Sequence, residues 1–182
     1  MIGSLFLDCV RRARPFGSRF FVLRFGNMSD IFLGLDFDKN SSAPINFLEN
    51  RFHDLSPFSA LEVEIDGVRY KTAEHAYHAL RVVPEARTEI MNASSPLEAW
   101  RLAQVCKEKD QLIEHDKDEL MERIFRAKLA QHESVKEVLL LTGERELLKV
   151  FDKDYYWGTG SDGTGQNKMG KLWMKLREEI RN

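Results

Sequence analysis

A glycine-rich stretch near the end of the chain combines two acids with three adjacent aromatic residues. It runs from Asp154 to Asn167 with the sequence DYYWGTGSDGTGQN, and its glycines at 158, 160 and 163 satisfy the pattern GxGxxG. A dinucleotide-binding fingerprint would open a helix inside a βαβ unit, and a Walker loop would end in Gly-Lys-Ser/Thr, so both are rejected. What remains is a long loop that ends at a helix start near Asn167, where backbone N–H groups suit a phosphate or another anion. The alternative is a flexible surface loop without a ligand.

A second candidate is the segment EHAYHALR, which runs from Glu74 to Arg81. Glu74, His78 and Arg81 are spaced i, i+4 and i+7, so a helix would place them on one face. The carboxylate could carry acid–base or charge-stabilising chemistry. The alternative is an acid in the first turn of a helix, which the helix dipole stabilises without a catalytic role. His75 and His78 lack the HExxH spacing of a zinc site, so we expect no metal.

Lys128 is the third candidate, because it continues the apolar stripe that contains Met121 and Phe125. A lysine on such a stripe usually extends its ammonium group out of the edge of the core into water. If Lys128 were enclosed instead, burial would lower the pKa of its ammonium, and the amine could act as a nucleophile or as an electrostatic group. The sequence favours the exposed ammonium.

The elements that would position these candidates follow from turn residues and hydrophobic periodicity. Apolar residues alternate at 61, 63 and 65 before Asp66-Gly67, which predicts a β-hairpin with a type I′ turn. Thr72 can cap a helix that runs to about residue 82, and Ser95 and Ser134 each begin a capping box. A stripe at 120–125 predicts another helix, residues 147–151 a short strand, and residues 169–180 an amphipathic helix. We therefore expect a single α+β domain, mostly helical, with a small antiparallel sheet.

The composition of the 182 residues limits the class of protein. With 43% hydrophobic residues and a net charge of -2, the chain can bury a core and is no dedicated duplex-DNA binder. No stretch reaches the roughly 18 apolar residues that a membrane helix needs. Cys9 and Cys106 form no CxxC pair, so neither a disulfide scaffold nor a cysteine zinc cluster is expected. These features predict a cytoplasmic protein.

The first 27 residues differ in composition from the rest, with five arginines, no lysine and one acid. They could be an organelle transit segment, but we favour a start site placed too early, with Met28 opening the working protein. Residues 1–44 are thus interpreted as an N-terminal extension and residues 45–182 as the domain. Deletion of residues 1–27 is expected to leave fold and activity intact.

Four motifs together resemble the NADAR family, the YbiA-like N-glycosidases. The family has LSNF, then Y-x-x-x-EH-x-Y-Q, then K-F, TG and finally D-x-x-WG-x-G-x-D-G-x-G-x-N-x-x-G. The chain has LSPF at 55–58, YKTAEHAYH at 70–78, LTG at 141–143 and the glycine loop at 154–170, in the same order. It departs from the pattern at Pro57, His78 and Arg81, where the family has Asn, Gln and Lys. These departures concern hydrogen bonds to the leaving base.

The resemblance implies hydrolysis of the bond between a ribose C1 and a nitrogen, within a compact α+β fold and without a cofactor. Two substrate types are associated with the family: ADP-ribose attached to guanine, and phosphoribosyl-aminopyrimidine intermediates of riboflavin synthesis. The expected partner is thus a small nucleotide-like molecule or ADP-ribosylated nucleic acid, with no membrane and no obligate protein partner. The alternative is a non-catalytic module that binds ADP-ribose or another NAD derivative.

The family also implies roles for the candidate residues. Cleavage develops positive charge at C1, which a carboxylate can stabilise, and Glu74 and Asp154 are the candidate carboxylates. Lys128 falls where the family has a lysine before an apolar residue, and it could form a Schiff base with an opened ribose or pair with a phosphate or a carboxylate. We expect Glu74 to do chemistry while the loop binds and encloses the ligand. The expected substrate-binding residues are Tyr77, His78, Arg81, Trp157, Gly158, Gly160, Asp162, Gly163 and Asn167.

Overall fold

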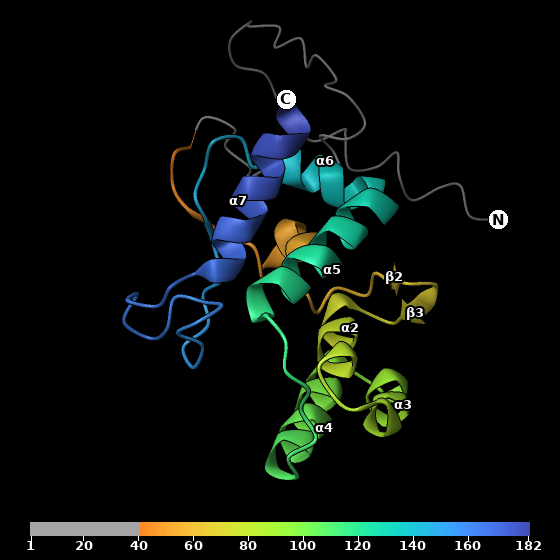
Figure 1. The fold of residues 1–182 in the computed structure, drawn as a ribbon. Coiled ribbons are helices and arrows are strands. Elements are labelled where there is room, and N and C mark those ends of the chain that lie inside the picture. The colour runs from red at the N-terminus through yellow and green to blue at the C-terminus, as the bar shows by residue number, and fades with distance from the viewer. Residues whose placement is uncertain (1–40) are drawn as a thin grey trace, which may run out of the picture. The chain divides into compact units, whose positions relative to one another are not determined.

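The computed structural model describes residues 41–182, so the predictions for residues 1–40 lie outside the described part. In this part the chain forms six α-helices, one 3-10 helix and four short strands (Figure 1). In chain order these are β1 (Ile45–Asn46), η1 (Asn50–Leu55), β2 (Val63–Ile65), β3 (Val68–Tyr70), α2 (Ala73–Leu80), α3 (Pro84–Asn92), α4 (Pro96–Glu108), α5 (Lys117–Gln131), α6 (Glu133–Leu141), β4 (Leu147–Leu148) and α7 (Lys168–Arg181).

The helices form two groups that meet at α2 (Figure 1). Helices α2, α3 and α4 pack on one another, while α5 packs on α6 and α7. Contacts between α2 and α5 join the groups, and both helices also contact β2. Helix α2 therefore occupies a central position, which suits an element that has to hold functional side chains rigidly.

The predicted hairpin is confirmed by the antiparallel pairing of β2 with β3. Asp66 and Gly67 form its turn with φ values of 52° and 75°. Two consecutive positive φ values are what a type I′ turn requires, and glycine adopts them without a steric penalty. The hairpin leads directly into Thr72 and the start of α2.

A second pair of strands was not expected from the sequence. Strand β1 pairs with β4 in parallel, with Ile45 opposite Leu147. The α+β class is confirmed, but only the hairpin is antiparallel. Strand β4 ends at Leu148, short of the predicted residue 151, because the chain beyond it pairs with the glycine loop instead: the Thr159 N–H donates to the Lys149 carbonyl at 3.0 Å.

Two of the three predicted helix caps are present. The Thr72 hydroxyl accepts from the His75 N–H, and the Ser95 hydroxyl accepts from the Glu98 N–H. The predicted cap at Ser134 is wrong, because α6 already begins at Glu133. His132 ends α5 and precedes α6, so the two helices follow each other with a single residue between them and Ser134 falls inside the first turn.

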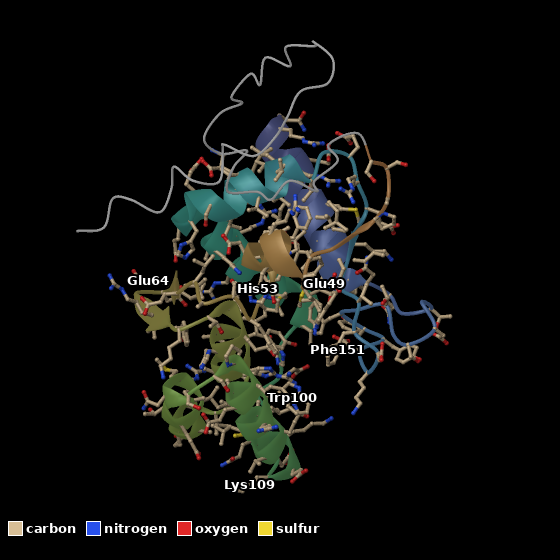
Figure 2. All side chains as sticks on the ribbon, turned by 180° about the vertical axis from the view of Figure 1, so that it is seen from behind. Glu49, His53, Glu64, Trp100, Lys109 and Phe151 are labelled. Carbon is tan, nitrogen blue, oxygen red and sulfur yellow. The ribbon has the colours of Figure 1, made fainter. Side chains whose placement is uncertain are left out.

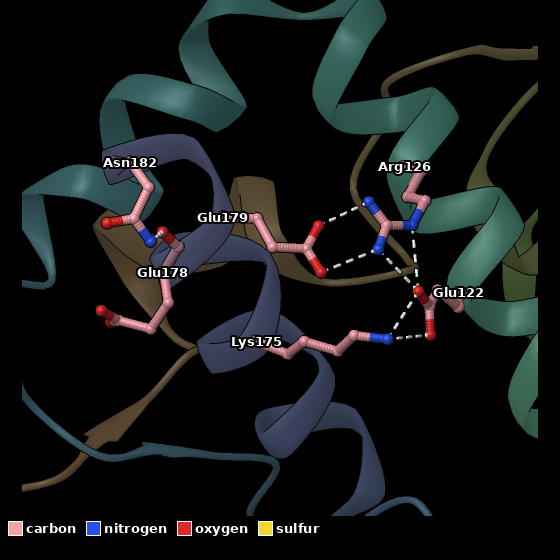
Figure 3. Close-up of polar contacts among 6 residues, drawn as sticks. All are labelled: Glu122, Arg126, Lys175, Glu178, Glu179 and Asn182. Atoms are coloured by element: carbon pink, nitrogen blue, oxygen red, sulfur yellow. Dashed lines mark hydrogen bonds and ion pairs between the residues drawn. The ribbon is translucent and has the colours of Figure 1, made fainter.

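Aromatic packing joins α5, α7 and η1 in the core. The rings of Phe125 and Trp173 stack at 4.3 Å, and the Trp173 indole N–H donates to the Leu55 carbonyl at 2.9 Å. On the outside of the same helix pair, Arg126 donates to Glu122 and Glu179, and Lys175 donates to Glu122 (Figure 3). These exposed ion pairs contribute little to stability compared with the stacked rings.

Within residues 41–182, no helix has the length and hydropathy that crossing a membrane requires. Trp100 on α4 and Phe151 after β4 are the large apolar side chains labelled in Figure 2, and about half of each is exposed. Isolated exposed apolar residues of this kind are common and imply no function by themselves.

Candidate active site

Helix α2 holds Glu74 and His78 as a hydrogen-bonded pair. The Glu74 Oε1 lies 2.8 Å from the His78 Nε2, as the i, i+4 spacing predicts, and the two side chains are 11% and 4% exposed. The Glu74 N–H donates to the Pro57 carbonyl at 3.0 Å, which ties the first turn of α2 to the segment after η1. Hydrogen bonds therefore fix both the backbone and the carboxylate of Glu74, and a small part of the side chain stays exposed to solvent.

Aromatic rings lie beside this pair. Tyr77 makes edge-to-face contacts with His78, at 5.2 Å between ring centroids, and with Trp157 of the glycine loop, at 5.9 Å. The Arg81 guanidinium lies 5.1 Å from the Tyr77 ring. Burial raises the pKa of Tyr77, and the Arg81 charge opposes that rise. The structure thus brings Glu74, Tyr77, His78 and Arg81 together with Trp157, and their predicted roles stay predictions.

A hydrogen bond from α5 fixes the aromatic part of the loop. The Tyr156 hydroxyl donates to Asp118 Oδ1 at 2.6 Å, and Lys168 donates to the other carboxylate oxygen at 2.6 Å. The bond to Asp118 raises the pKa of Tyr156 to about 12. Tyr156 also contacts Trp157 edge to face at 5.0 Å, so this bond sets the position of Trp157. Sequence analysis missed Asp118, because an acid in the first turn of a helix is explained by the dipole alone.

Asp154 is engaged within the loop it begins. Its Oδ1 accepts from the Trp157 and Tyr156 N–H groups at 2.8 and 3.2 Å, and its Oδ2 accepts from Lys149 at 2.7 Å. Burial acts to raise the pKa of Asp154, but the Lys149 ammonium and the two N–H donors outweigh it and hold that pKa below its usual range. The carboxylate is thus ionised and saturated with donors that build the turn. Its predicted catalytic role stays a prediction.

Asn167 and the start of α7 differ from expectation. The Asn167 side chain donates to the Leu147 carbonyl at 2.9 Å and accepts from the Lys149 N–H at 3.1 Å. The N–H groups of residues 167, 168 and 169 donate to the carbonyls of residues 158, 156 and 157. The helix start that we expected to receive a phosphate is therefore closed by the loop's own carbonyls, because the loop folds back against it.

The glycines serve the same self-packing. A Cβ at Gly158 would lie 2.8 Å from the Lys149 carbonyl oxygen, and one at Gly165 would lie 2.3 Å from the Gly158 oxygen. Gly160 and Gly163 have positive φ values of 67° and 77°. Asp162, which is exposed, accepts from the N–H and hydroxyl of Thr164 within a local turn. The predicted contacts of Gly158, Gly160, Asp162 and Gly163 with a substrate stay predictions. The packing of the loop against itself is enough to account for each of these residues.

Lys128 is completely enclosed, so the expectation of an exposed ammonium is wrong. Its Nζ donates to the Ser56 carbonyl at 2.6 Å and to the Ser59 hydroxyl at 2.7 Å. Burial lowers the pKa of Lys128 to about 7, against a weaker opposing effect of Asp54. The stripe position could not reveal this, because the enclosing segment Ser56–Ser59 lies about seventy residues away in the sequence.

Within residues 41–182, no three His, Cys, Asp or Glu side chains lie close enough together to hold a metal ion. The His75 Nδ1 lies 2.8 Å from the Thr72 hydroxyl and its Nε2 3.3 Å from the Ala93 carbonyl, so this histidine joins the helix cap to the end of α3. Burial lowers the pKa of His75.

Comparison with known proteins matches the sequence and the fold of this chain to the NADAR family. The sequence profile of the NADAR domain matches residues 37–181. N-glycosidase YbiA of Escherichia coli K12 is 35% identical over 140 residues, which cover 75% of this chain and 88% of the relative. A riboflavin biosynthesis protein of Vibrio vulnificus is 31% identical over 131 residues, which cover 69% of this chain and 35% of that protein. The NMR structure of E. coli YbiA superposes with a TM-score of 0.68 and 32% identity, covering 78% of this chain and 86% of that one.

The architecture is therefore that of a YbiA-like α+β protein, with two helical groups and a small hairpin. The chain belongs to the NADAR family, and the resemblance seen in the sequence motifs is confirmed.

Proposed function

We propose that the chain cleaves the bond between a ribose C1 and a nitrogen in an ADP-ribosyl compound, such as ADP-ribosylated guanine, or in a phosphoribosyl-aminopyrimidine. The reaction class follows from the family: the chain is an enzyme, a hydrolase of N-glycosyl bonds, like the relatives named N-glycosidase. A relative named as a riboflavin biosynthesis protein supports the phosphoribosyl substrate. The guanine-linked substrate is supported by the family resemblance of the motifs.

The observation that carries the proposal is the Glu74–His78 pair beside the aromatic wall of Tyr77 and Trp157. Positive charge builds at C1 as the bond to the base lengthens, and a carboxylate held at a fixed position stabilises that charge without rearranging. Trp157 offers a ring face to the base. The hydrogen bond from the Trp157 N–H to Asp154 and the close packing at the loop glycines hold Trp157 in place.

A two-substrate assay tests this function. The purified chain is incubated with ADP-ribosylated guanosine and, separately, with the phosphoribosyl-aminopyrimidine, and the release of free base and sugar phosphate is measured. We expect release from one of the two. A folded protein that releases base from neither substrate contradicts the proposal, and tight binding of ADP-ribose by such a protein would identify it as a non-catalytic binding module.

The low pKa of Lys128 favours a second, covalent route. A pKa of about 7 makes the neutral, nucleophilic amine accessible near neutral pH. After ring opening, C1 is joined to the base nitrogen as an imine; the amine would add to C1, the base would leave as a free amine carrying both protons of the lysine amine, and water would then hydrolyse the resulting lysine imine to release the sugar. Because Lys128 is enclosed, the Ser56–Ser59 segment has to move before this attack.

Borohydride separates the two routes, because its hydride reduces an imine to a stable amine. On the covalent route, treatment during turnover leaves a sugar adduct on Lys128, seen by mass spectrometry and lost in Lys128→Met. If turnover is normal and no adduct forms, Lys128 is structural and the route through Glu74 stands alone.

A further inference from the structure

Four buried polar atoms near the C-terminal half of α2 have no hydrogen-bond partner among the described residues. They are the Tyr77 hydroxyl, the His78 Nδ1, the Arg81 Nε and the His115 Nε2. The Trp157 indole acts to lower the pKa of the Tyr77 hydroxyl, but the two groups do not meet hydrogen-bond geometry. Buried polar groups in folded proteins are nearly always paired, so a cluster of unpaired ones calls for a ligand or ordered water.

Backbone pairing places His115 with the other three. The segment before α5 runs antiparallel to the end of α2: Val82 is bridged to Leu112, and the Ile113 N–H donates to the Arg81 carbonyl at 3.0 Å. Two residues further, the His115 Nδ1 lies 2.8 Å from the Ile113 carbonyl. His115 is thus tethered beside the last turn of α2, where Arg81 in turn contacts the Tyr77 ring.

The partners of the two histidines decide what their unpaired nitrogens can do. In His115 the Nδ1 must carry the proton, because its partner is a carbonyl oxygen, which can only accept. In His78 the Nε2 carries the proton that is donated to the Glu74 carboxylate. In the neutral form of each ring the other nitrogen is then a bare acceptor. The cluster therefore offers two acceptors, the N–H donor of Arg81 and a hydroxyl that can do either.

This pattern does not suit a phosphate. The dianion of a phosphate ester presents only acceptors, so both imidazoles would have to become cations next to the Arg81 guanidinium. A nucleobase edge that carries N–H donors beside a carbonyl oxygen would satisfy every group without a change of charge. The neighbouring rings of Tyr77 and Trp157 suit the flat faces of such a base.

We propose that His78, Arg81 and His115 form the base-recognition subsite of this chain, which selects a leaving base with N–H donors adjacent to a carbonyl. The histidines accept from the N–H groups and Arg81 donates to the carbonyl. His115 belongs to none of the family motifs found in the sequence, and the family's glutamine and lysine stand where this chain has His78 and Arg81. The proposal rests on the proposed function in one respect: the function is what identifies the bound base as the leaving base of a substrate.

Nitrogen NMR of the histidine-labelled full chain tests this without turnover. From the tautomers that these hydrogen bonds set, we expect His78 Nδ1 and His115 Nε2 to resonate as unprotonated nitrogens. Guanosine, which has two N–H sites beside a carbonyl, should shift both signals, while methyl phosphate, whose dianion has acceptors only, should shift neither. If both rings are fully protonated and respond to methyl phosphate, the cluster is an anion site and the proposal is overturned.

Binding by matched ligands and variants gives a second measurement. We expect 1-methylguanosine, which lacks one N–H donor, to bind about tenfold more weakly than guanosine, the effect of one lost buried hydrogen bond. His115→Phe should abolish this discrimination or weaken guanosine to the same level. His115→Gln, whose amide oxygen accepts, should restore part of it. The control is His53→Phe on η1, a histidine outside the cluster whose Nδ1 lies near the Leu48 carbonyl (Figure 2).

Equal binding of the two ligands by the wild-type chain, or failure of both to bind, contradicts the subsite. These outcomes are independent of the assay for function. A chain that cleaves neither proposed substrate yet discriminates the two nucleosides loses the proposed reaction and keeps the subsite. A chain that cleaves a substrate without discriminating them keeps the reaction and loses the subsite.

Discussion

The inner face of α2 and the glycine loop meet at Trp157, and they differ in how their polar groups are used. On α2 and at its C-cap, the side chains of His78 and Arg81 keep buried polar atoms without a partner among the described residues. In the loop, Asp154 and Asn167 have their side-chain oxygen and amide groups bonded within the loop or to β4. The loop has the longer and more specific motif, yet the buried polar atoms that lack a partner lie on α2 and at its C-cap.

This difference teaches that a motif can encode the shape of a site rather than its contacts. The glycines, Asp154 and Asn167 are required for the loop to fold back on itself and to place Trp157 opposite Tyr77. Such residues resist substitution as strongly as catalytic ones, because buried groups without partners cost about 1–3 kcal/mol each. Mutations can separate the two cases, since a loss of shape lowers stability and a loss of chemistry does not.

The largest effect on rate is expected from Glu74→Gln. It should lower kcat about a hundredfold or more, with little change in affinity, because it removes a charge that acts mainly in the transition state. The matched control is Glu85→Gln, which also removes an acid from the first turn of a helix, α3. Steady-state kinetics and thermal melting measure both. Normal turnover in Glu74→Gln would show that α2 does not supply the catalytic carboxylate and that Glu74 only interacts with the helix dipole.

A large effect on stability is expected from the pH dependence caused by Lys128. Its pKa is about 7 in the folded chain and 10.5 in the unfolded one. Between these values the unfolded state holds one more proton, so the free energy of unfolding rises with pH, by about 1.4 kcal/mol per pH unit. Below pH 7 both states are protonated and this dependence vanishes.

Urea unfolding of wild type and Lys128→Met between pH 6 and 10 isolates this contribution. The stability gained by the wild type over this range should be absent from the variant. Lys175→Met, which removes an exposed lysine of α7, serves as the control and should keep the wild-type slope. Equal slopes in wild type and Lys128→Met would show that the lysine is not enclosed in solution.

The self-packing of the loop is tested by two alanines. At Gly165 a Cβ would meet the backbone of Gly158 and Thr159 within 2.5 Å, so Gly165→Ala should cost about 2–3 kcal/mol of unfolding free energy. At Gly163 nothing lies within 4 Å, and only the positive φ of 77° opposes alanine, at about 1 kcal/mol. Urea unfolding compares them. Equal losses would mean that the loop is not folded against itself, and the contrast with α2 would disappear.

The smallest effect is expected where α5 fixes the loop. Tyr156→Phe removes the hydrogen bond to Asp118 and keeps the ring, so Trp157 becomes less well placed. We expect KM to rise about three- to tenfold with kcat nearly unchanged, in line with roughly 1 kcal/mol for one partly exposed bond. Tyr155→Phe, which removes a hydrogen bond to Ser161 at the surface, should leave both constants unaltered. A fall in kcat instead would place Tyr156 in the chemistry itself.

Local sequence determined the features that depend on neighbouring residues. The Asp66-Gly67 turn, the cap at Thr72 and the Glu74–His78 spacing were predicted because each requires only a few consecutive residues with defined backbone preferences. The motifs also identified the family. The cap at Ser134 failed for a reason that no local pattern contains, namely that α5 and α6 leave only His132 between them.

Only the tertiary structure decided which polar groups have hydrogen-bond partners within the protein and which have none among the described residues. Lys128 is enclosed and hydrogen-bonded by a segment 72 residues away, Asp118 accepts a hydrogen bond from Tyr156 across 38 residues, and His115 lies beside the end of α2 because of backbone pairing. Hydrogen-bond satisfaction and desolvation depend on what encloses a group in space, and a spacing rule along the chain cannot express that. For this reason the sequence could indicate the candidate residues, while only the fold shows that the polar groups of the glycine loop are bonded within the structure and that those of His78 and Arg81 are not.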